Sequence, residues 1–110
     1  MKTITCLIVA MALLVATVSF AAQGFNNEQL SFSTATGFTK ATLKDTNGII
    51  ATQAFCSVEG ANVRYWTSAT PTASVGILVS SGGWVSITGT GDILNVLFIP
   101  VSGTAVMNCQ

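Results

Sequence analysis

The side chains that could do chemistry in this chain are few, and two cysteines come first. Cys56 and Cys109 are the cysteines that remain once an N-terminal leader carrying Cys6 is removed. In an exported chain an even pair of cysteines indicates a disulfide. That bond would close a loop of about fifty residues and stabilise the folded chain by roughly 4 kcal/mol in the chain-entropy model. Unpaired or intermolecular cysteines are the alternative.

Acid–base catalysis has few suitable groups in this sequence. There is no histidine, which removes the usual general base, a common metal ligand and every Ser-His or Cys-His nucleophile pair. The four acids that follow the leader, Glu28, Asp45, Glu59 and Asp92, stand singly among turns and strand ends. Their spacing is not that of a glycosidase pair. We therefore predict a protein that is not an enzyme and that holds no metal and no cofactor.

Two short motifs resemble ligand loops but are interpreted as turns. Gly-Thr-Gly-Asp at 89–92 would cradle a phosphate only at the start of a helix. The apolar run Ile93 to Ile99 that follows it predicts a strand instead. Asp45 beside Asn47-Gly48 begins like a calcium loop, but the remaining oxygen ligands are missing.

Aromatic side chains suggest a different kind of site. Exposed rings of Trp66 and Trp84 would form platforms on which sugars stack, as in secreted carbohydrate-binding modules. Val63 and Tyr65 share the strand face expected to point inward, which leaves Arg64 and Trp66 outward or against a neighbour. Arg64, Trp66 and Trp84 are therefore the candidate ligand or partner contacts. Packing of these aromatic rings is the favoured competing interpretation.

The elements that would position these residues are short strands. Alternating runs separated by Gly and Asn predict about eight of them, with no sustained helical period after Glu28. The clearest hairpin is expected over 38–46 and 49–58, joined by Asn47-Gly48 in a type I′ turn. The run Ile93 to Ile99 is expected to be a strand covered on both faces. The predicted fold is all-β, a small antiparallel β-sandwich that is immunoglobulin-like or jelly-roll-like.

The first 21 residues have the pattern of a secretory signal peptide and predict an N-terminal signal helix. Lys2 precedes the apolar segment Ile4 to Phe20, Ala21 and Ala22 follow it, and Ser19 and Ala21 supply the small residues expected before a cleavage site. A membrane anchor is the alternative, although a spanning helix needs about 20 apolar residues and flanking charges. Cleavage after Ala21 would leave one domain, residues 22–110, exported to the periplasm or the medium. Its contact with a membrane would be transient.

The charge of that domain argues against several partners. Three cationic side chains stand against four acids, a net charge of −1. A nucleic-acid binder needs clustered Lys and Arg, so nucleic acid is excluded as a partner. So few charges suggest a surface covered by neighbours, with further copies of the chain or other structural proteins as partners. Surface glycans are the alternative ligand.

The segment 62–76 also resembles a known family. Its pattern of Val63-Arg64-Tyr65, then Pro71-Thr72-Ala73 and Gly76, with Glu59 before it, resembles small β-sandwich proteins encoded among the structural genes of tailed phages and prophages. The resemblance spans Thr52 to Asn108. It implies a non-enzymatic structural or decoration domain, virion-associated or displayed on an exported surface, that acts through protein–protein assembly.

A weaker similarity concerns the immunoglobulin-like modules of chitobiase and hexosaminidase type. Both families usually carry Asp-Gly in the turn where this chain has Ser68-Ala69. The alternative function is accordingly a secreted carbohydrate-binding module that uses exposed aromatic residues.

Overall fold

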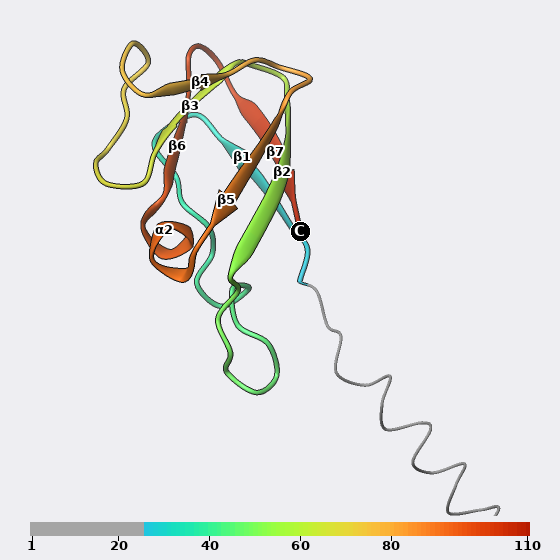
Figure 1. Ribbon diagram of the computed structural model, residues 1–110. Helices are drawn as coiled ribbons and strands as arrows, with labels where there is room; N and C mark the ends of the chain where they lie inside the picture. Colours follow the sequence, from blue (N-terminus) through green and yellow to red (C-terminus); the bar gives the residue numbers. More distant parts are fainter. Residues whose placement is uncertain (1–25) are drawn as a thin grey trace, which may run out of the picture.

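The structure, a computed structural model, describes residues 26–110 as two antiparallel sheets with one apolar core between them (Figure 1). The first sheet has the order β1-β7-β2-β5, and the second has the order β4-β3-β6. The small all-β sandwich is thus confirmed for these residues, and the predicted signal peptide lies outside them. The elements are β1 (Glu28–Phe32), β2 (Gln53–Glu59), β3 (Val63–Trp66), β4 (Ile77–Val79), β5 (Trp84–Thr88), α2 (Thr90–Asn95), β6 (Leu97–Pro100) and β7 (Ala105–Cys109).

The strands pair in a nested order. The first strand pairs with the last, β1 with β7, and further inside β2 pairs with β5 and β3 with β4. Between the β1–β7 pair and the β2–β5 pair, Thr36 forms an isolated bridge to β6. Its backbone exchanges two hydrogen bonds of 2.8 Å with Phe98. The first half of the chain therefore pairs antiparallel with the second half. Seven strands form in the described part of the chain, and the predicted strand over 38–46 is absent.

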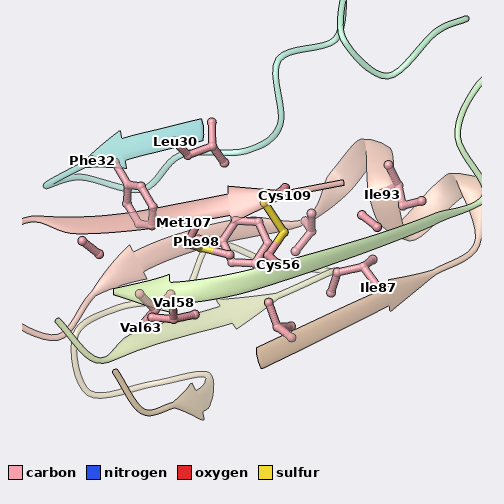
Figure 2. Packing of buried hydrophobic residues seen from close by; sticks show 14 of the residues in the cluster. Leu30, Phe32, Cys56, Val58, Val63, Ile87, Ile93, Phe98, Met107 and Cys109 are labelled. Carbon is pink, nitrogen blue, oxygen red and sulfur yellow. A yellow bond between two sulfur atoms is a disulfide. The ribbon is translucent and has the colours of Figure 1, made fainter. Parts of the chain in front are cut away.

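The core forms because apolar residues alternate along the strands. In β2, Ala54, Cys56 and Val58 are buried while their neighbours point outward. Met107 from β7 and Phe98 from β6 are fully buried at the centre of the cluster, as Figure 2 shows. A period of two residues places every second side chain on one face, so each strand contributes one apolar row to the core.

The predicted disulfide between Cys56 and Cys109 is confirmed (Figure 2). The two residues are directly opposed in the β2–β7 ladder, with Cα atoms 4.1 Å apart. Beside them, Phe55 and Gln110 exchange two backbone hydrogen bonds of 2.9 Å. The cysteines therefore occupy the adjacent non-hydrogen-bonded position, where opposed side chains approach most closely.

The prediction of a long hairpin over 38–46 and 49–58 is wrong. Between these segments, the ladder is reduced to a bridge between Lys44 and Ile50 with two flanking backbone bonds. Both edges of β2 are already occupied, one by β5 and the other by β7. No edge of β2 is left for residues 38–46 to pair with, whatever their alternation.

The type I′ turn is also wrong, although the chain does reverse there. Gly48 has φ 79°, but no non-glycine residue from 26 to 110 has positive φ, so Asn47 is not left-handed. The turn instead centres on Thr46 and Asn47, and Gly48 N–H donates to Asp45 C=O over 3.1 Å.

The apolar run Ile93 to Ile99 is not one strand, and its first part ends the helix α2. Ile93 N–H donates to Gly89 C=O over 3.0 Å, and Val96 N–H donates to Asp92 C=O over 2.8 Å. Ile93 and Val96, three residues apart, are both buried, so one face of this turn closes the end of the sandwich. A short apolar run is compatible with either period, and here the helix is the observed one.

Strand character begins at Leu97, where Phe98 and Pro100 are buried and Leu97 and Ile99 are half-buried. Pro100 ends β6, as expected for a residue without an N–H. Within residues 26–110, no helix has the length and apolarity needed to span a membrane.

Replacing both cysteines with alanine should lower the free energy of unfolding by about 4 kcal/mol, because the unfolded chain regains the freedom of a loop spanning 53 residues. Urea denaturation of the wild type and the C56A/C109A variant measures the difference. Dithiothreitol should lower the urea midpoint of the wild type to that of the variant and leave the midpoint of the variant unchanged. Equal midpoints for the variant and the oxidised wild type would contradict this account.

Candidate functional site

The sheet β1-β7-β2-β5 has an outward surface, called here the outer face, that is almost uncharged. A single row crosses all four strands, because Gln29 opposes Asn108, Asn108 opposes Ser57, and Ser57 opposes Trp84. Glu59 is the one charged residue at the outward positions of these strands. The outer face comprises Gln29, Ser31, Gln53, Phe55, Ser57, Glu59, Trp84, Ser86, Thr88, Val106 and Asn108.

Two aromatic rings stack at one end of this row. The ring centroids of Phe55 and Trp84 lie 4.9 Å apart with 20° between the planes. Trp84 is 62% exposed and Phe55 39% exposed, so the pair leaves a continuous apolar surface toward solvent. The rings come from neighbouring strands in diagonal positions, a separation that large side chains can span.

Amide and hydroxyl groups continue the row beyond the rings. The Gln29 Nε2 donates to Asn108 Oδ1 over 2.9 Å, which orients both exposed amides. Ser57 lies between Asn108 and Trp84 in the register. These residues and the aromatic pair line a shallow groove of about 390 Å³, together with Asn27, Glu28, Cys109 and Gln110.

A second surface, the β4 edge, is aliphatic and consists of Val75, Ile77 and Leu78. Their exposed fractions are 44%, 53% and 48%. β4 is the outermost strand of its sheet and pairs with β3 alone. No charged residue occurs from Thr67 to Thr88, so the usual protection of an edge by lysine is missing here.

Arg64 holds the loop that leads into β4. Its Nε donates to Ala73 C=O over 3.1 Å, and its Nη1 donates to Gly76 C=O over 2.9 Å. In the same loop the side-chain oxygen of Thr72 accepts from Val75 N–H over 3.0 Å, and Pro71 is fully buried. The polar stretch 67–76 is thus a braced connection between two strands. Arg64 has an intramolecular role, and its contact with a partner stays a prediction.

The three predicted contact residues are not brought together. Arg64 and Trp66 lie on β3 of one sheet, whereas Trp84 lies on β5 of the other. Trp66 is half-buried and opposes Leu97 of β6, while Val63 and Tyr65 point toward the core as expected. Of the three, Trp84 alone belongs to the outer face.

Sequence reasoning missed Phe55, Gln29 and Asn108. Phe55 had a usable signal, because it alternates with Ala54 and Cys56 and so shares a face with polar Gln53 and Ser57. The two amides had none, since nothing in the sequence brings β1 beside β7.

The carboxylates of Glu28 and Asp45 lie beside a cavity of about 340 Å³. Both are hydrogen-bonded within the chain. Glu28 accepts from Thr39 N–H and from Thr42 Oγ1, and Asp45 Oδ1 accepts from the N–H groups of Asn47 and Ile49. Across residues 26–110, three or more His, Cys, Asp or Glu never gather as a metal site would require.

Comparisons with models of protein families, with curated proteins and with solved structures find no match to this chain. Its function must therefore be argued from these surfaces.

Gly76→Ala should destabilise the fold by about 1–3 kcal/mol. Gly76 has φ 131°, and a Cβ there would lie 3.1 Å from the Pro71 Cβ and 3.3 Å from the Arg64 Cβ. The matched control is Gly91→Ala, because a Cβ at this helical position meets nothing within 4 Å. That control should be neutral or stabilising by about 0.5–1 kcal/mol. Thermal unfolding of both variants checks the difference in sign, and equal effects would refute the role of Gly76.

Proposed function

We propose that this protein is a non-enzymatic structural or decoration domain that acts by assembling with further copies of itself. The observation that carries the proposal is the β4 edge. Val75, Ile77 and Leu78 are each close to half exposed, on a strand with a free side, and no residue from Thr67 to Thr88 is charged. Exposed apolar side chains on an unprotected edge strand are typical of a surface that another chain covers.

The bracing of the adjoining loop supports this use of the β4 edge. Arg64 fixes Ala73 and Gly76, so Val75 is held in place beside Ile77 rather than carried on a free loop. A preorganised contact loses less conformational entropy when it binds. β4 has three residues, so side-chain burial more than a long backbone ladder would stabilise the contact.

The strand order supports a jelly roll rather than an immunoglobulin-like sandwich. In the immunoglobulin arrangement the last strand joins the second sheet, and the conserved disulfide links the two sheets. Here β7 lies between β1 and β2 in the first sheet, and Cys56–Cys109 joins two strands of that same sheet. Jelly rolls recur in viral capsid domains and in lectins.

The cellular setting of the proposal is an oxidising one. The disulfide is compatible with an exported location, because disulfides persist where thiols are not kept reduced. We propose display on an exported surface, or on a virion as the resemblance of segment 62–76 implies.

Leu78→Glu should weaken self-association at least about tenfold, since a carboxylate would have to be desolvated in an apolar contact. Glutamate is chosen because Leu78 opposes Arg64 in the β3–β4 register, so the new charge faces a cation and the monomer is spared repulsion. Light scattering after size exclusion, over a range of concentrations, measures the mass of each species.

Ser102→Glu is the matched control, because it adds the same charge at an exposed turn and should leave the association unchanged. A wild-type protein that remains monomeric at every concentration tested would sink the proposal. So would an oligomer that L78E leaves intact.

A further inference from the structure

We infer that the outer face is a binding site for neutral oligosaccharides, separate from the β4 edge. The inference starts from the aromatic pair. Trp84 is 62% exposed and stacks on Phe55. Burying these rings in the core would have gained apolar contact, yet the strand alternation holds both outward. Stacking covers one face of each ring, and the remaining exposed surface of Trp84 is apolar like the C–H face of a pyranose ring.

The polar part of the row matches the rest of a sugar. Sugar hydroxyls both donate and accept hydrogen bonds, and amides and serine hydroxyls offer the same two functions without charge. Gln29, Asn108 and Ser57 continue the row from Trp84 across the sheet. Because the amides of Gln29 and Asn108 are already bonded to each other at 2.9 Å, their free donors and acceptors are oriented before a ligand arrives.

The length of the row favours an oligosaccharide over a single sugar. Three inter-strand steps of about 4.8 Å separate Gln29 from Trp84, roughly 14 Å in total. The groove above it is open and shallow, so an extended chain can lie across the strands.

The charged residues near the outer face indicate whether it can bind neutral or acidic glycans. The cations that follow the leader are Lys40, Lys44 and Arg64, and all three lie outside the outer face. Glu59 is the one charged residue at the outward strand positions, and Glu28 lines the groove. Both carboxylates would repel sulfates and uronates. The ligand expected is therefore a neutral glycan and not an acidic one.

The first experiment is binding of the purified protein to an array of neutral oligosaccharides, namely β-glucan, mannan, galactan and chitin fragments, with heparin and polygalacturonate for comparison. At least one neutral class should bind, and neither acidic polymer should bind better. Trp84→Ala should lower the affinity for that glycan by at least about tenfold, because it removes the stacking surface. Asn108→Ala should lower it several-fold.

Leu94→Ala is the matched control, since Leu94 is an apolar residue 37% exposed on α2, outside the outer face. Its glycan affinity should stay within twofold of the wild type. Circular dichroism and thermal melting of each variant establish that the fold survives.

A spectroscopic readout tests the contact at Trp84 directly. The chain has two tryptophans, so Trp66→Phe leaves Trp84 as the single indole. Its fluorescence should shift to the blue when the bound glycan excludes water from the ring. Binding without such a shift would show that the sugar lies elsewhere.

The outcomes separate this inference from the assembly proposal. L78E should retain full glycan binding, and W84A should retain the oligomer. If no neutral glycan binds, or if heparin binds best, the outer face is not a neutral glycan site. If W84A instead dissociates the oligomer into monomers, the outer face is a protein interface, and the inference is overturned.

Discussion

The insertion of β7 between β1 and β2, sealed by the disulfide, is the constraint on which the rest of the structure depends. Cys109 is opposed to Cys56, so the register of the two strands is locked at that pair. A shift by one residue would exchange the two faces of β7 and expose Met107. Because the pair is locked, Asn108 must lie beside Ser57 on the outer face. The disulfide therefore stabilises the core and also fixes which residues of β2 and β7 meet in the surface row.

The outer face and the β4 edge lie on different sheets and differ in composition. On the outer face the alternation of β2 and β5 places Phe55 and Trp84 outward among amides and hydroxyls. The β4 edge is aliphatic and lies on the other sheet, where Arg64 and the buried Pro71 brace the loop that carries Val75. One surface thus has the composition of a polar ligand site, and the other that of an apolar contact between chains.

Two of the wrong expectations share a physical cause. The pattern at 38–46 alternates like a strand, but β2 is already paired on both sides. The run after Gly91 is apolar like a buried strand, but Ile93 and Val96 reach the core from one turn of helix. Local pattern reports which residues prefer burial, and it does not report which neighbours are free to pair.

The amino-acid sequence by itself predicted the class of the fold, the inward side of Val63 and Tyr65, and the disulfide between Cys56 and Cys109. The first two follow from residue type and a period of two along the chain, and the third from the two cysteines that remain after the predicted leader. The tertiary structure alone decided the nested strand order, the helix α2 and the meeting of Gln29, Asn108, Ser57 and Trp84. Those four residues come from four different strands, and only the pairing of β7 with β1 and β2, and of β2 with β5, brings them into one row.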